Sequence, residues 1–167
     1  LIRSRGLGDV YKRQVANSFN DSLISYTAAH GSIKNGSLEG LWTFWNTNGN
    51  LASKQFYKNG SPNGMYTSYH PSTGKKIEYG LIVGYDDFGK IKRDGKWIIQ
   101  DSTGLLIEEI TYHNGKRHGL TTLFSPNGSQ NAKIIYNQSL PWNGKWSSWY
   151  TNGNKKESGL YEEGEKK

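Results

Sequence analysis

The chain has 167 residues and a formal net charge of +7, with 21 glycines, 13% aromatic residues, 34% hydrophobic residues and no cysteine. This length is that of one ordinary domain, and few aliphatics beside many rings and glycines indicate a thin or elongated all-β protein. The composition excludes disulfides, thiolate metal sites and a cysteine nucleophile, and no run of about 18 apolar residues is present that could form a membrane-spanning helix.

Residues 1–14, LIRSRGLGDVYKRQ, carry four basic groups and one acidic group and show no strand pattern. They resemble a translated sequencing adapter, so we expect a non-native or disordered leader outside the fold. The other 17 basic and 13 acidic groups are scattered, which argues against a nucleic-acid-binding stripe. A chain that begins with Leu is typical of a fragment whose signal peptide would be missing, and its location stays open between the bacterial cytoplasm and the cell envelope.

An internal repeat dominates the rest of the chain. Residues 15–39 are expected to form a lead-in strand and a partial first repeat. The phrase GLWTFWNTNGN at 40–50 then returns as GKWSSWYTNGN at 144–154, with weaker copies that begin at Gly64, Gly95 and Gly119. A second segment follows each copy and ends in a glycine, often with Tyr three residues before it. The period is about 24 residues, which predicts five hairpins over 40–167.

Asn-Gly pairs punctuate these repeats. Asn-Gly is the strongest short hairpin signal, because a type I′ turn needs positive φ at both central residues. The eight pairs begin at Asn35, Asn48, Asn59, Asn63, Asn114, Asn127, Asn143 and Asn152. The predicted turn glycines are Gly49, Gly60, Gly64, Gly104, Gly115, Gly119, Gly128, Gly144 and Gly153. The predicted fold class is therefore all-β: an elongated single-layer antiparallel sheet of repeated β-hairpins.

Two features depart from strict regularity. A longer stretch between Gly84 and Gly95 interrupts the period once, and the glycine expected after Tyr136 is missing. At the end of the chain, the spacing after Gly164 places the next glycine at position 168. We therefore expect the array to be truncated there, with an exposed sheet edge.

Aromatic residues recur in phase with the repeat. Since side chains alternate along a strand, Trp42 and Trp45 are predicted to point to opposite faces, so that each face carries a ladder of rings that packs the hairpins together. Packing is the default role, and a partly open ladder would bind a partner. The candidates are Trp42, Trp45, Tyr57, Tyr66, Tyr69, Trp97, Tyr112, Phe124, Trp146, Trp149 and Tyr161.

The sequence gives little support for catalysis or metal binding. His113 and His118 flank a turn, but a zinc site needs at least a third ligand. Asp86 and Asp87 are adjacent, so in a strand they would point apart and could not converge as an acid–base pair. Known nucleophile, phosphate-loop and zinc motifs are absent from the sequence. We expect no enzyme activity, no cofactor and no metal.

The motifs FYKNGSPNG at 56–64, TYHNGKRHG at 111–119 and LYEEG at 160–164 resemble the MORN repeat, in the bacterial variant of the YwqK-type antitoxin family. The resemblance covers 36–167, apart from the two departures described above. It implies a solenoid of β-hairpins that acts as a non-enzymatic scaffold for protein–protein interaction. The antitoxin label implies that the partner is a toxin, neutralised by direct contact.

Two other binding functions stay open. GKWSSWYTNG at 144–153 is also similar to choline-binding cell-wall repeats, which would make the partner a glycan or cell wall, although those units are nearer 20 residues long. The net charge of +4 on 15–167 and the name of the repeat also suggest contact with anionic lipid. A degenerate enzyme is the least favoured alternative.

Overall fold

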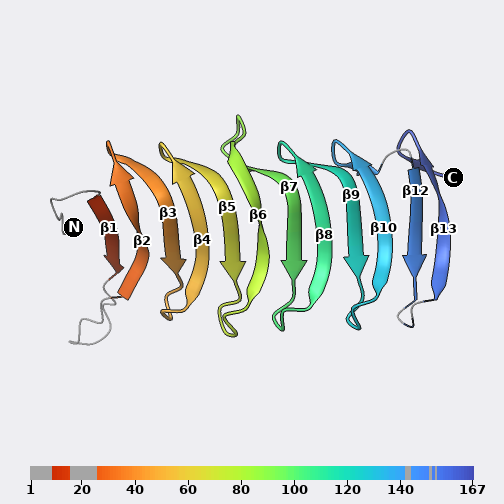
Figure 1. The fold of residues 1–167 in the computed structure, drawn as a ribbon, viewed down its shortest axis with the longest axis horizontal. Coiled ribbons are helices and arrows are strands. Elements are labelled where there is room, and N and C mark those ends of the chain that lie inside the picture. The colour runs from red at the N-terminus through yellow and green to blue at the C-terminus, as the bar shows by residue number, and fades with distance from the viewer. Residues whose placement is uncertain (1–8, 16–25, 142–143, 151, 153) are drawn as a thin grey trace.

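The computed structural model describes residues 9–15, 26–141, 144–150, 152 and 154–167, and within these ranges all of the regular structure is β-strand (Figure 1). The strands, in chain order, are β1 (Asp9–Val15), β2 (Tyr26–Lys34), β3 (Ser37–Trp45), β4 (Leu51–Lys58), β5 (Ser61–Tyr69), β6 (Lys76–Tyr85), β7 (Ile91–Gln100), β8 (Leu106–His113), β9 (Lys116–Phe124), β10 (Gln130–Asn137), β11 (Leu140–Pro141), β12 (Gly144–Trp149), β13 (Lys155–Glu162) and β14 (Glu165–Lys166).

All fourteen strands belong to one antiparallel sheet in which nearly every strand pairs with its neighbours in sequence. The exception is the two-residue β11, which pairs back onto β10, so that β10 also pairs with β12. Figure 1 shows a ladder of hairpins that is long in the direction perpendicular to the strands. The predicted fold class is confirmed.

Part of the predicted leader, residues 1–14, is described in the structure. Residues 1–8 lie outside the described residues, whereas residues 9–15 form β1, which pairs with β2. The division into a leader, a partial repeat over 15–39 and repeats over 40–167 stays a prediction.

The two edges of the ladder use different turns. At the upper edge in Figure 1, two-residue turns have positive φ at both positions, for example 49° at Asn114 and 88° at Gly115. The Asn35-Gly36 and Asn59-Gly60 turns have the same form. At the lower edge the loops are longer: in one of them, the N–H of Gly49 donates to the Asn46 carbonyl at 2.9 Å, and only the glycine has positive φ. This is a type I turn followed by a left-handed residue.

The predicted turn glycines occupy different places in the fold. Gly60 and Gly115 lie in type I′ turns, and Gly49, Gly104 and Gly128 end the lower loops. By contrast, Gly64 and Gly119 lie inside β5 and β9, and Gly144 begins β12, because the turn that precedes each lies a few residues upstream. Gly153 lies outside the described residues. Two type I′ turns contain no Asn-Gly pair: Gln138-Ser139 and Glu163-Gly164.

The upper turns also bond to the preceding repeat. The backbone N–H groups of Gly60, Gly115 and Ser139 donate to the carbonyls of Leu38, Arg93 and Arg117 at 2.9, 2.7 and 2.8 Å. In each case the acceptor lies 22 residues earlier in the chain. A carboxylate adds a second bond in two repeats, since Glu39 accepts from the N–H of Asn59 and Asp94 accepts from that of Asn114, both at 2.9 Å. Each turn thus fixes the register of two neighbouring hairpins.

The lower loops are closed by their own side chains. In one of them, Asp101 Oδ1 accepts hydrogen bonds from the Thr103 hydroxyl at 2.6 Å and from the N–H groups of Thr103 and Leu105 at 2.8 and 3.0 Å. The bond from the Thr103 side chain is the main cause that lowers the pKa of the Asp101 carboxyl below its usual value.

The extra residues between Gly84 and Gly95 lengthen one hairpin and leave the alternation of upper and lower turns intact. Strands β6 and β7 are each ten residues long, and their pairing contains two register shifts. Their connection is the longer loop Asp86–Gly89, which reaches beyond the neighbouring turns in Figure 1. The irregularity is thus absorbed at the upper edge.

One face of the sheet, called here the tryptophan face, holds the buried side chains. Trp42 is 2% exposed and Trp97 is fully buried, and each indole lies over a glycine of the preceding strand. A Cβ placed on Gly31 or Gly80 would come within 2.3 or 2.4 Å of these rings. The indole N–H groups donate to the carbonyls of Ser32 at 3.1 Å and Leu81 at 3.0 Å. The sheet therefore buries these two indoles without a second layer, because a glycine leaves room beneath each ring.

The core around Trp97 is a small cluster closed by an arginine. Trp97, Ile82 and Ile110 are each at most 1% exposed, and Tyr66 and Tyr112 pack against them. The guanidinium of Arg93 lies 4.4 Å from the Trp97 ring centroid and pairs with Glu78. The arginine covers the indole and satisfies a carboxylate on the same face, which suits its flat shape.

Thr121 occupies the tryptophan position of its repeat, faces Ile110 and is 1% exposed. Its hydroxyl has no hydrogen-bond partner among the described residues. We expect Thr121→Val to raise the free energy of unfolding by about 1–2 kcal/mol, because it removes an unsatisfied buried hydroxyl while nearly keeping the volume. Urea unfolding followed by circular dichroism checks this, and a less stable variant would show that the hydroxyl is satisfied in solution.

Candidate binding surfaces

The eleven ring candidates differ in burial. Trp42, Trp97 and Trp146 are buried on the tryptophan face. The other eight are half-buried: Trp45, Tyr57, Tyr66, Tyr69, Tyr112, Phe124, Trp149 and Tyr161. Several of these complete the packing, as Tyr66 stacks at 5.9 Å from Trp97 and Tyr161 lies 6.4 Å from Trp146.

Tyr57 illustrates a half-buried ring on this face. Burial is the main cause that raises the pKa of its phenol above the usual value of 10.0, with nearby Tyr85 and Tyr66 adding to the effect. The ring therefore stays neutral over the physiological range. The role of these eight rings in binding stays a prediction.

The opposite face carries exposed apolar side chains, none of which is among the predicted ring candidates. Leu41 faces Phe56 across β3 and β4, and Met65 faces Leu81 across β5 and β6. Further along, Leu120 faces Ile135 across β9 and β10. Each is a sequence neighbour of a residue on the tryptophan face, so alternation places it on the other side. These six side chains are called the apolar row. Five of them are 38–51% exposed, and Leu81 is half-buried.

A repeat signal for this row exists in the sequence. Leu41, Met65 and Leu120 are the middle residue of Gly-x-Trp or its variants, and Phe56 and Ile135 directly precede the tyrosine of the second strand. These residues are the immediate neighbours of the ring positions in sequence, and alternation along the strand places them on the opposite face.

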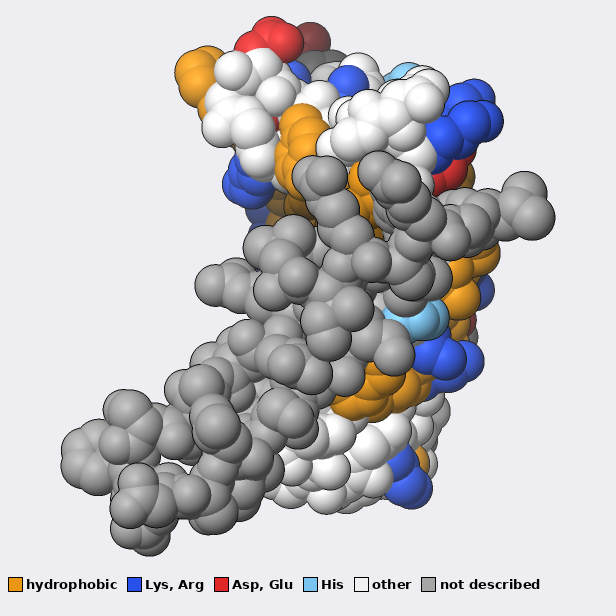
Figure 2. Space-filling model, turned by 90° about the vertical axis from the view of Figure 1, so that its left-hand side faces the viewer, with side chains coloured by type: hydrophobic (Ala, Val, Ile, Leu, Met, Phe, Trp, Pro, Cys, Tyr) orange, Lys and Arg blue, Asp and Glu red, His pale blue; other side chains and the backbone are white. Residues whose placement is uncertain are grey.

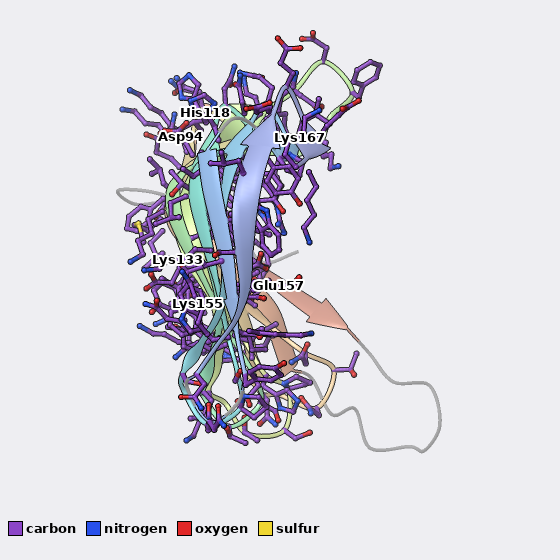
Figure 3. The ribbon with its side chains drawn as sticks, turned by 90° about the vertical axis from the view of Figure 1, so that its right-hand side faces the viewer. Asp94, His118, Lys133, Lys155, Glu157 and Lys167 are labelled. Carbon is purple, nitrogen blue, oxygen red and sulfur yellow. The ribbon has the colours of Figure 1, made fainter. Side chains whose placement is uncertain are left out.

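Lysines accompany the row. Lys54 and Lys133 lie two residues before Phe56 and Ile135 on the same strands, and therefore on the same face. Among the described residues neither forms an ion pair, whereas Lys96 on this face pairs with Glu109 at 2.9 Å. Figure 3 shows Lys133 on the opposite side of the sheet from Glu157. Figure 2 views the molecule from its other end, and hydrophobic side chains lie close to Lys and Arg side chains along its right-hand rim.

The histidine pair and the aspartate pair have structural neighbours. The rings of His113 and His118 lie 5.9 Å apart, and His113 Nδ1 is 3.4 Å from Asp94 Oδ1. Over the described part of the chain, no group of three or more such side chains is arranged to hold a metal ion. Asp86 Oδ1 accepts from the N–H groups of Phe88 and Lys90 at 3.0 and 2.8 Å, as a turn residue does.

The loop that Asp86 closes presents Phe88, which is 95% exposed at its tip. The flanking Tyr85 and Ile91 are also exposed, at 44% and 37%. A large exposed ring on a hydrogen-bonded loop is a second apolar feature, separate from the row.

An acidic hollow lies at the C-terminal hairpin. It is lined by Glu162, Glu163, Glu165 and Lys167, and Lys167 pairs with Glu165 at 3.1 Å. No helix in the described ranges is long and apolar enough to cross a membrane.

Comparison with known families identifies the same repeat in two places. Residues 38–59 and 142–163 match the family model described as MORN repeat variant. The first segment covers most of β3 and β4 with their lower loop, and the second covers the corresponding hairpin at the C-terminal end. No curated protein matches the chain. MORN repeats form non-catalytic scaffolds and are generally associated with binding to proteins or membrane lipids.

Proposed function

We propose that this chain is a non-enzymatic scaffold that binds a protein through the apolar row. The observation that carries the proposal is the row itself, because five half-exposed apolar side chains recur on the face of the sheet opposite the buried Trp42, Trp97 and Trp146. The two matches to a MORN repeat variant support a binding role.

The finer proposal is that the partner is a toxin, neutralised by direct contact. It rests on the resemblance of FYKNGSPNG and TYHNGKRHG to the YwqK-type antitoxin motifs. The row gives such a contact a surface of the right kind, since the fully buried core of a protein interface is more apolar than its rim and poor in charged residues. A bacterial source and a bacterial partner belong to the same proposal.

The test is retention of a partner by the purified chain, followed by reconstitution with that partner in purified form. We expect Met65→Glu, which adds a charge to the centre of the row, to weaken binding at least tenfold, and Phe88→Ala to leave it unchanged. For the finer proposal, expression of the isolated partner should arrest growth, and co-expression of the chain should restore it.

A partner whose affinity is unaffected by Met65→Glu would contradict the role of the row. A partner that is harmless to the cell would contradict neutralisation alone. Binding to a glycan array, or to vesicles that contain phosphatidylglycerol, in place of any protein would favour the glycan or lipid alternatives.

A further inference from the structure

We propose that the part of the row on β3 to β6 binds an acidic amphipathic α-helix that lies across the strands. This inference rests on the proposed function and specifies the chemistry of the partner segment. The site consists of Leu41, Phe56, Met65 and Leu81, with Lys54 beside them.

The spacing of the site matches a helix. Leu41, Phe56, Met65 and Leu81 come from four consecutive strands, and each is paired with or adjacent to the next. Neighbouring strands lie about 4.8 Å apart, and an α-helix rises about 5.4 Å per turn. A helix that crosses the strands therefore offers one apolar side chain per turn to one strand, and the mismatch over three steps is only about 2 Å.

The length of the site is bounded on the next strand. Leu81 faces Asp94 on β7, and Asp94 holds the turn at Asn114 and contacts His113. The row therefore meets a carboxylate after four strands. A helix that fits the apolar part has about three turns, or about 11 residues.

The charge of the site favours carboxylates on the helix. Lys54 is on the same face as Phe56 and Leu41 and forms no ion pair with any residue that the structure describes. An acidic side chain on the flank of the helix would pair with this ammonium group. Glu39, Asp94 and Glu109 share this face, and a uniformly anionic bilayer would press all three against like charge. A helix can instead direct its acidic flank toward Lys54, which lies on the other side of the Leu41–Phe56 pair from Glu39.

The probe is a synthetic 18-residue peptide of Leu and Glu, with Leu at helical spacing i, i+3, i+4 and i+7. Its control is a scrambled peptide of the same composition. Fluorescence anisotropy with the full chain should give at least tenfold tighter binding of the amphipathic peptide. Met65→Glu should weaken this binding at least tenfold. Lys54→Glu should weaken it several-fold and should strengthen binding of a Leu/Lys peptide of the same spacing.

The matched control is Phe88→Ala, which leaves the site intact and should bind like the unmodified chain, and circular dichroism confirms that each variant keeps its strands. Equal binding of the two peptides, or equal binding to the Met65→Glu variant, would overturn the inference. So would phosphatidylglycerol vesicles that bind through Met65 when the peptide does not. If binding of a purified protein partner depends on Met65 but the amphipathic peptide does not bind, the inference of a helical partner is wrong and the proposed function stands.

Discussion

Replacing Trp97 by alanine should lower the free energy of unfolding by about 3–5 kcal/mol, the range found when a large buried ring is removed. Trp97 is fully buried and joins Ile82 and Ile110 in the central cluster. Its removal leaves the Leu81 carbonyl without its indole donor and takes away the ring on which Arg93 lies. In a domain whose total stability is about 5–15 kcal/mol, this loss is a large fraction.

The glycine beneath the ring makes the test specific. The backbone of Gly80 has no positive φ, so alanine is excluded there only by the indole, whose Cδ2 would lie 2.4 Å from the new Cβ. Gly80→Ala alone should cost about 1–3 kcal/mol through overpacking. In the Trp97→Ala background the same change should cost nothing, since the space above Gly80 is then open.

Urea unfolding followed by far-ultraviolet circular dichroism gives the four free energies of this double-mutant cycle. The expected coupling energy is about 1–3 kcal/mol. Phe88→Ala is the matched control for removal of a ring, because Phe88 is 95% exposed and should change stability by less than about 0.5 kcal/mol. Additive effects of the two substitutions would show that Trp97 does not lie over Gly80 in solution.

The second large effect is expected at the turn between β8 and β9. Changing both Asn114 and Gly115 to alanine should cost about 2–4 kcal/mol, because both residues have positive φ and each such alanine costs about 1–2 kcal/mol. The new Cβ at position 115 would also lie 3.3 Å from Lys92 Cγ. The same change would strain the hydrogen bonds that the backbone N–H groups of this turn donate to Asp94 and Arg93.

Asn63→Ala is the control for this prediction. Asn63 also belongs to an Asn-Gly pair, yet it lies inside β5 and has no positive φ. It should change stability by less than about 0.5 kcal/mol when replaced. Thermal unfolding of both variants checks the difference. Equal losses of stability would mean that the positive φ angles of Asn114 and Gly115 do not determine the cost of substitution there.

The hairpin repeat was predictable because it depends on the spacing of residues that are close together in the sequence. The glycine and ring positions around Trp42 and Trp146 gave the fold class and the period correctly. The turns were less predictable, because an Asn-Gly pair also fits a lower loop, as at Asn48, or the interior of a strand, as at Asn63. Conversely, Gln138-Ser139 forms a type I′ turn without the favoured residues, held by the bond from Ser139 to Arg117.

The candidate site was harder to predict than the fold. Burial of Trp97 depends on Gly80, which is 17 residues away and reaches it only through the register of β6 and β7. The spacing of residues within a single strand does not show which residue of the neighbouring strand lies opposite. The apolar row was within reach of the sequence, because Met65 follows Gly64 as Leu41 follows Gly40. The rings are the more prominent signal in the sequence, but Trp42, Trp97 and Trp146 are buried in the structure.

Pairing of nearly every strand with its neighbours in sequence has a mechanical consequence. Tension applied along the long axis of the ladder loads the hydrogen bonds between two strands one after another, as in a zipper, and not all at once in shear. The molecule should therefore extend at low force and in small steps, each releasing one hairpin. A tether of this kind would yield gradually between two attached bodies and close again when the tension falls.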